Sequence, residues 1–316
     1  TAVGKEALAA NTIGFNNTSV GSDALATNTT GYHNTAFGTF ALNLNDGDFN
    51  TAVGQQALSE NTLGDFNVAL GNQALSSNKV GSRNTAVGSS STYNNTTGEE
   101  NTSVGSRALF NNVAGSKATA IGRDAMYNAN NTTTAFDNQN VAVGYEALKG
   151  SPTPADNTGN SNTAIGYQTL LNNSEGRENV AVGTNALQAN EIAIQNTAVG
   201  VNALKSLIGG GDDSGSFNVA VGFNTLTNNE YGTFNTAIGS YSLEDNVNGS
   251  ANIAMGYFAL RNTTAHNNIA IGKEAMESND AGSKGIAIGT SAMANLGNTT
   301  TPFENLNVAI GYESLK

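Results

Sequence analysis

The 316-residue sequence has no cysteine and no tryptophan, and it has only three prolines and two histidines. Without cysteine the chain can form no disulfide framework, no thiolate zinc site and no cysteine nucleophile. Charged residues make up 12% of the chain, which is about half of the share usual in globular domains. No apolar run reaches the roughly 20 residues that a membrane-spanning helix needs. These absences argue against a disulfide-rich module and a transmembrane segment.

Positive charge is also scarce. Thirteen Lys and Arg stand against 25 Asp and Glu, which gives a net charge of -12. Affinity for nucleic acid and for anionic membranes depends on clustered Lys and Arg, so both partners are excluded. The sequence starts at Thr1 with neither an initiator Met nor a signal peptide, and we expect it to be a segment of a longer protein.

Asparagine, threonine and glycine are abundant instead, with 49, 35 and 37 residues. They belong to a repeat that covers the whole chain, and we expect residues 1–316 to form one continuous array. The string Asn-Thr-Ala-Val-Gly or a close variant recurs in 18 copies, and 11 of the 17 spacings are 17 residues, two are 16 and four are 22. We call its last residue the repeat glycine, and it stands at positions 4, 21, 38, 54, 71, 88, 105, 122, 144, 166, 183, 200, 222, 239, 256, 272, 289 and 311.

Aligning the copies on the repeat glycine shows which positions are constrained. The preceding residue is always large and apolar, and the one before that is Ala in 16 copies and Ser at Ser19 and Ser103. Three residues before the glycine stands Thr, Val or Ile, usually after an Asn. The third residue after the glycine is small, and the fourth is Leu or Met in all copies except Thr92.

A β-branched, small, large apolar and glycine sequence has the period of two that indicates a strand. The Ala-Leu segment would form a second strand or a bend, and the Asn and Gly that follow favour a turn. One strand, bend, strand and turn in 17 residues predict one coil of an all-β parallel β-solenoid with about 18 coils. The alternative is a helical repeat, but this usually needs more than 30 residues.

The small residue and the large residue of the strand lie on opposite faces, and both positions are constrained. We expect a thin coil to be unable to cover both faces. The hypothesis is therefore that neighbouring chains pack against the small residues, as in a homotrimer with those residues nearest its axis. Ala142→Leu or Ala198→Leu would then weaken assembly.

The unit Asn-Thr-Ala-Val-Gly-x-x-Ala-Leu, as in residues 196–204, resembles the head repeats of YadA-like trimeric autotransporter adhesins and the repeat shafts of phage tail-fibre proteins. The resemblance covers essentially the whole chain. It implies a left-handed parallel β-roll that assembles as a trimer. The sequence departs from the adhesins in its longer repeat and in having no neck, coiled-coil stalk or membrane anchor.

Candidate chemical sites are few. His33 and His266 have no second histidine at a metal-ligand spacing. The acidic segments 45–48 and 212–213 do not have the remaining oxygen ligands of a calcium loop, and the Gly run 209–211 does not continue into a phosphate-binding loop. We therefore predict no catalytic, cofactor-binding or metal-binding residue and no enzyme activity.

Two repeated features could still bind a ligand. The Thr row before the repeat glycines could order water and bind ice, although Val or Ile stands there in eight copies. The four long repeats lengthen the turn between the Ala-Leu segment and the next strand, and we expect their extra backbone to stay outside the coil. There it could form binding loops, or the insertions could be tolerated drift. Their extra residues fall within 127–139, 149–161, 205–217 and 296–307, and they include all three prolines.

Taken together, the sequence predicts a non-enzymatic structural or adhesive rod of an extracellular homotrimeric fibre on a bacterial cell surface. Its partners would be other copies of itself and a host-surface, matrix or glycan receptor. One alternative is a phage tail-fibre shaft carried on a virion. Another is an ice-binding or glycan-binding solenoid.

Overall fold

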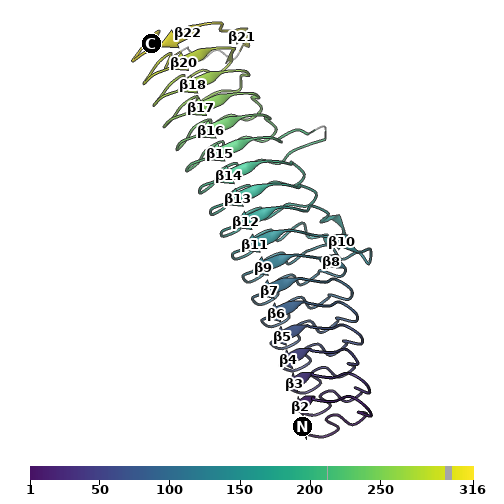
Figure 1. The fold of residues 1–316 in the computed structure, drawn as a ribbon. Coiled ribbons are helices and arrows are strands. Elements are labelled where there is room, and N and C mark those ends of the chain that lie inside the picture. Colours follow the sequence, from purple (N-terminus) through teal and green to yellow (C-terminus); the bar gives the residue numbers. More distant parts are fainter. Residues whose placement is uncertain (212, 296–300) are drawn as a thin grey trace. The chain divides into compact units, whose positions relative to one another are not determined.

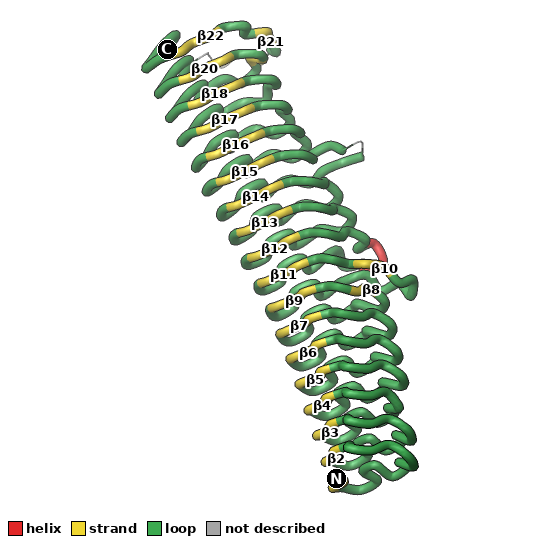
Figure 2. The backbone as a smooth tube through the Cα atoms, in the orientation of Figure 1, coloured by secondary structure: helices red, strands yellow, loops and turns green. Residues whose placement is uncertain are grey.

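The computed structural model describes residues 1–211, 213–295 and 301–316. These residues form strands, turns and one short 3-10 helix, with no α-helix among them. Contacts divide the chain into two compact units, Thr1–Asn160 and Ser161–Lys316. Each unit is a parallel β-solenoid, in which short strands recur at the same place in successive coils (Figures 1 and 2). The prediction of an all-β parallel β-solenoid is therefore confirmed.

The strands are two or three residues long and match the predicted positions before the repeat glycines. Unit 1 contains β1 (Ala2–Val3), β2 (Thr18–Val20), β3 (Thr35–Phe37), β4 (Thr51–Val53), β5 (Val68–Leu70), β6 (Thr85–Val87), β7 (Thr102–Val104), β8 (Gly115–Ser116), β9 (Thr119–Ile121), β10 (Phe136–Asp137), β11 (Val141–Val143) and the 3-10 helix η1 (Pro154–Asp156). Unit 2 contains β12 (Thr163–Ile165), β13 (Val180–Val182), β14 (Thr197–Val199), β15 (Val219–Val221), β16 (Thr236–Ile238), β17 (Ile253–Met255), β18 (Ile269–Ile271), β19 (Gly282–Ser283), β20 (Ile286–Ile288), β21 (Phe303–Glu304) and β22 (Val308–Ile310).

The strands of a unit stack in strict register, like residue on like residue. In β3 and β4, for example, Ala36 pairs with Ala52 and Phe37 pairs with Val53. Leaving aside the small pairs β8–β10 and β19–β21, 18 strands precede the 18 repeat glycines. Nine of these strands belong to each unit, and the chain has about 17 coils where the sequence predicted about 18.

The interior of each coil is lined by small side chains on the strand side and by Ala-Leu on the opposite side. In one coil, Ala52, Ala57 and Leu58 are all fully buried, while Thr51 and Val53 point outward. The coil is narrow, so a small side chain from the strand can meet a Leu from the facing segment without leaving a void. Burial of these residues thus needs no second chain.

The Ala-Leu segment is a turn and not the second strand that the sequence suggested as one option. Its second and fourth residues after the glycine adopt positive φ, as in Gln56 (55°) and Leu58 (51°). The Gln56 N–H donates to Thr39 O of the preceding coil at 2.9 Å, whereas the Leu58 N–H donates to Ala74 O of the following coil at 3.0 Å. The segment therefore stays hydrogen-bonded to both neighbouring coils without strand geometry.

The repeat glycine is confirmed as a position that excludes a side chain. All 18 have φ between 125° and 143°, a region that residues with a Cβ rarely adopt. A Cβ on Gly54 would lie 2.5 Å from the carbonyl oxygen of Gly71 in the next coil. Close stacking of the coils at this corner is therefore possible only with glycine.

Two rows of buried Asn residues run through each unit. In the turn ladder, formed by the Asn seven residues after the repeat glycine, the side-chain amide donates to the Asn of the preceding coil wherever that coil has one, as Asn78 does to Asn61 at 2.7 Å. In the strand ladder, formed by the Asn before the strand, the side-chain oxygen accepts a backbone N–H of the next coil, as Asn67 does from Asn84 at 3.0 Å. These amides satisfy turn backbone that would otherwise be buried without partners.

Three buried polar atoms without a partner lie where the turn ladder is interrupted. The Oδ1 atoms of Asn112, Asn190 and Asn246 accept no hydrogen bond. The next coil holds Ala129, Leu207 or Thr263, respectively, at the turn-ladder position, and none of these residues has a side-chain amide. Asn268 in the strand ladder also has an unpartnered Nδ2, although its Oδ1 accepts the Gly285 N–H at 2.9 Å as elsewhere in that ladder.

Candidate functional site

The longest candidate surface is the strand face, which we define as the outward side chains one and three residues before the repeat glycines. Of the large apolar side chains directly before the interior repeat glycines, six are partly buried (Val20, Val87, Val143, Val182, Val221 and Ile288), and the other ten are between 36% and 57% exposed. These ten are Phe37, Val53, Leu70, Val104 and Ile121 in unit 1, and Ile165, Val199, Ile238, Met255 and Ile271 in unit 2. An exposed apolar row that repeats along the chain is typical of a surface that packs against something else.

The structure corrects the argument that the small residues face another chain. Ala142 and Ala198 are fully buried inside their own coils. The repeat alignment showed that both faces of the strand are constrained, but the face with the small residues was expected to contact another chain, whereas it lines the interior of the coil. The homotrimer hypothesis now depends on the strand face, which carries the large residues.

The two histidines occupy different surroundings, and neither has a second histidine beside it. The His33 ring stacks on Phe49 with centroids 5.0 Å apart, between rings of neighbouring coils. His266 accepts the Ser250 N–H at Nδ1, at 3.0 Å. Within the described part of the chain, no three His, Asp or Glu side chains come together in a way that could hold a metal ion.

The acidic segment 45–48 has a structural role in the turn. Asp46 accepts backbone N–H groups of Thr29 at 2.6 Å and of Thr30 at 3.0 Å, and the Thr29 hydroxyl at 2.8 Å. Partial burial raises the pKa of Asp46, but these donors outweigh burial and hold the pKa below its ordinary value of 3.8. Asp48 accepts the Tyr32 N–H at 3.0 Å. The two carboxylates therefore cap the preceding coil.

Part of the second acidic segment, Asp212, lies outside the described residues. Its neighbour Asp213 has φ of 61° and is exposed. In the adjoining Gly run, Gly209 is buried with φ of 77°, and Gly211 has nothing within 4 Å of the place where a Cβ would be. The run is a loop without a following helix, so it has no phosphate-binding geometry.

The insertions leave the coil at the turn before the strand, as predicted, but they do not meet only solvent. Fewer than half of their described residues are exposed, and Ala129, Asn157 and Leu207 are among those that are buried. Asn157 donates from Nδ2 to Asn128 O at 2.5 Å. The prediction that the inserted backbone stays outside the coil is wrong for these residues. Of the fourth insertion, residues 296–300 lie outside the described part of the chain.

The first and fourth insertions share one arrangement, which argues against drift. Each adds a two-residue strand to an Ala-Gly-Ser-Lys segment of the coil before it, in the pairs β8–β10 and β19–β21. A Cβ on Gly115 would lie 2.8 Å from Cζ of Phe136, and a Cβ on Gly282 would lie 2.8 Å from Cζ of Phe303. The Lys of each segment pairs with the acidic residue after that Phe.

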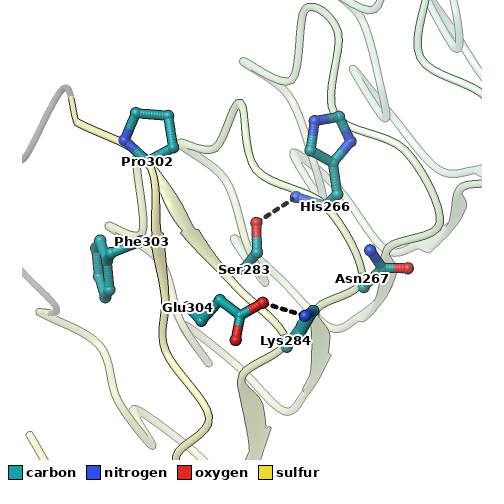
Figure 3. A pocket seen from close by; sticks show the side chains of 7 residues that line it. All are labelled: His266, Asn267, Ser283, Lys284, Pro302, Phe303 and Glu304. Atoms are coloured by element: carbon teal, nitrogen blue, oxygen red, sulfur yellow. Dashed lines mark hydrogen bonds and ion pairs between the residues drawn. The ribbon is translucent and has the colours of Figure 1, made fainter.

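The fourth insertion borders a cavity of about 460 Å³ (Figure 3). Lys284 and Glu304 form an ion pair across it, and the His266 backbone N–H donates to Ser283 Oγ at 3.2 Å. The His266 imidazole points away from that pair in the view of Figure 3. The charged groups are therefore matched to each other, and no side chain here is placed as a base beside a nucleophile.

A second cavity, of about 220 Å³, lies in unit 1 on the turn side of the coils. We call it the arginine–tyrosine cleft, because Arg107, Arg123, Tyr127 and Tyr145 line it together with Asp124, Glu146 and Lys149. Sequence reasoning missed this cluster, since its members come from three coils and are 42 residues apart from first to last. The available signal was the repeat alignment, which places all of them within five residues after a repeat glycine.

Aromatic rings also stack from coil to coil. Phe15 and Tyr32 lie 4.9 Å apart with nearly parallel planes, and so do Phe49 and Phe66. Stacked rings cover one face of each other, while Phe15 and Phe66 remain 54% and 51% exposed. The stacking stabilises the contact between coils.

No helix of the described residues has the length and apolar character required to cross a membrane. Comparison with protein families found no family model that matches the chain. Comparison with curated proteins found no match either.

Proposed function

We propose that this chain is a non-enzymatic structural and adhesive segment of an extracellular fibre on a bacterial surface, in which three identical chains pack side by side through their strand faces. The observation that carries the proposal is the exposed apolar row along this face. Each solenoid unit fills its own interior with Ala, Leu and Asn, so the outward row is not needed for the fold of one chain.

The strand face fits a second copy of the same chain. It carries Thr, Val, Ile and other uncharged residues, although the whole chain has a net charge of -12. Self-association through a charged face would bring like charges together, whereas association through this face would not. The in-register stacking presents an equivalent side chain at every coil, so identical chains can match coil by coil in a closed symmetric assembly.

Sedimentation equilibrium of the chain tests the proposal. We expect a trimer for the natural sequence and a folded monomer for the double variant Val53→Glu/Leu70→Glu, because each Glu would place a charge in the apolar contact. The matched control is Gln55→Glu/Asn72→Asp, which adds two negative charges to exposed turn positions of the same coils. A well-folded monomer of the natural sequence would refute the trimer.

Ice binding is a second candidate, favoured by one observation in unit 1. Six of the eight strands stacked from β2 to β11 begin with Thr, and these side chains point outward. In unit 2 only three of nine strands begin with Thr, namely β12, β14 and β16. Thermal hysteresis of the purified chain decides this candidate, and its absence would remove it.

A further inference from the structure

The arginine–tyrosine cleft gathers cations in a chain that has few of them. Three of the 13 Lys and Arg line this one cavity, with two acidic residues beside them. The corresponding turn positions of the earlier coils at Gly54 and Gly71 hold uncharged Gln, Asn and Ser. The residues that line the cleft have a net charge of +1, from three cations and two anions, whereas the whole chain has a net charge of -12.

One carboxylate holds two guanidinium groups in place. The Asp124 side chain is only 5% exposed. Arg107 Nη2 donates to Asp124 Oδ2 at 2.8 Å, and Arg107 Nε lies 2.8 Å from Oδ1 without hydrogen-bond alignment. Arg123 Nε approaches Oδ2 at 3.3 Å. The Arg123 side chain lines the cleft and is 60% exposed, and its contact with Asp124 is through Nε, so the two terminal nitrogens of its guanidinium are not part of that contact.

Aromatic rings line the same cleft. The Arg107 guanidinium lies 5.2 Å from the centre of the Tyr127 ring, and that of Arg123 lies 5.8 Å from the centre of the Tyr145 ring. Tyr127 also stacks on Phe110, with centroids 5.1 Å apart. These contacts restrict both guanidinium groups before any ligand arrives, which lowers the entropy cost of binding.

Glu146 and Lys149 also line the cleft and form an ion pair, with Lys149 Nζ 2.7 Å from Glu146 Oε1. The Glu146 side chain is 13% exposed. An acceptor of this kind suits a ligand that brings its own hydroxyl donors. It also repels a ligand whose only polar groups are carboxylates, such as an acidic peptide. The cavity of about 220 Å³ is below the usual range for drug-sized ligands, so it suits a single ring or head group.

We propose that the arginine–tyrosine cleft binds an acidic saccharide, with the sugar carboxylate on Arg123, the ring against Tyr145 and the hydroxyl groups near Glu146. The planar guanidinium matches a carboxylate with two parallel hydrogen bonds. This inference gives a ligand class to the proposed adhesive role and rests on it. The cleft lies on the turn side of the coils and not on the strand face, so saccharide binding and assembly can fail separately.

The test is binding of methyl glucuronide to the whole chain in low salt, followed by chemical-shift changes and compared with methyl glucoside. We expect the glucuronide to bind at least about tenfold tighter than the glucoside, because loss of a charge-assisted bond costs about that factor or more. Arg123→Gln should lose the same factor. The matched control is Arg83→Gln, whose side chain is equally exposed in unit 1 but lies outside the cleft.

Arg123→Lys provides a second variant that keeps the charge and removes the planar fork, and circular dichroism confirms the fold of each variant. We expect Arg123→Lys to bind the glucuronide more weakly than the natural chain does. The proposal is overturned if the glucuronide does not bind, or if Arg83→Gln weakens binding as much as Arg123→Gln. It is also overturned if tetraglutamate binds as tightly as the glucuronide and depends equally on Arg123, since the site would then take acidic peptides.

Discussion

The interrupted turn ladder predicts a substitution that stabilises unit 2. Thr263 occupies the turn-ladder position between Asn246 and Asn279 and is 2% exposed. The buried Oδ1 of Asn246 has no hydrogen-bond partner. Thr263→Asn would supply an amide that donates to Asn246 and an oxygen that accepts from Asn279, as in the unbroken stretch of the ladder from Asn28 to Asn95. The coil has room for it, because Asn45 is fully buried at the same position of the other 16-residue repeat.

The magnitude follows from the bonds that are made and lost. Two buried hydrogen bonds form, and one is lost, because the Thr263 hydroxyl now accepts the Ala265 N–H at 3.1 Å. One net bond, together with a partner for the buried oxygen, should raise the free energy of unfolding of this coil by about 1–2 kcal/mol. Amide hydrogen exchange in the coil should slow about 5- to 30-fold as a result.

Amide hydrogen exchange is the suitable assay, because repeat arrays open locally and a single melting temperature would average over many coils. The reciprocal change Asn45→Thr, in unit 1, should speed exchange around Asn28 and Asn61, since it removes the amide that joins them. If Thr263→Asn leaves exchange unchanged or faster while Asn45→Thr has no effect, the ladders do not stabilise the coils and the reasoning is refuted.

Three further outcomes can be measured. Gly183→Val should lower the free energy of unfolding by more than the roughly 1–3 kcal/mol that backbone strain alone would cost, because φ is 130° and the new Cβ would lie 2.5 Å from a carbonyl oxygen of the next coil. Gly211→Val is the control and should leave the free energy of unfolding, measured by chemical denaturation, nearly unchanged. Ala198→Leu should lower the free energy of unfolding by about 1–3 kcal/mol, because it overpacks the interior of a single chain. The decrease should be the same at every protein concentration, and a decrease that depends on concentration would contradict this. Asp46→Asn should make the free energy of unfolding depend less on pH in the acid range. Because the pKa of Asp46 is lowered in the folded state, its stabilising contribution is present above about pH 4 and is lost as the pH falls through the folded-state pKa. An unchanged pH dependence would exclude this role.

The sequence by itself determined the coil. Because each copy imposes the same local constraints, a single chain yields 18 independent observations of every position. An invariant glycine, a β-branched residue and a small residue reflect backbone sterics, which act locally. The strand position, the parallel register and the strained glycine could therefore be predicted, and the structure confirms them.

Which face of the strand is inside could not be predicted. Alternation defines two faces, but only the path of the whole coil shows which one meets the Ala-Leu segment. One exception to the repeat shows the same dependence on packing. Thr92 replaces the usual Leu, and its hydroxyl lies 2.5 Å from Ser103 Oγ, where the next coil has Ser in place of Ala. The two departures compensate each other across coils, which a position-by-position alignment does not reveal.

The candidate sites depend entirely on stacking. Arg107, Arg123 and Tyr145 are ordinary turn residues in the sequence, and they form a cleft only because successive coils place equivalent positions one above another. The buried Asn157 and Leu207 likewise show where an insertion returns to the interior. Local patterns record the constraints on one coil, whereas a site made of several coils depends on side-chain contacts between residues about one repeat apart, and only the tertiary structure decides those contacts.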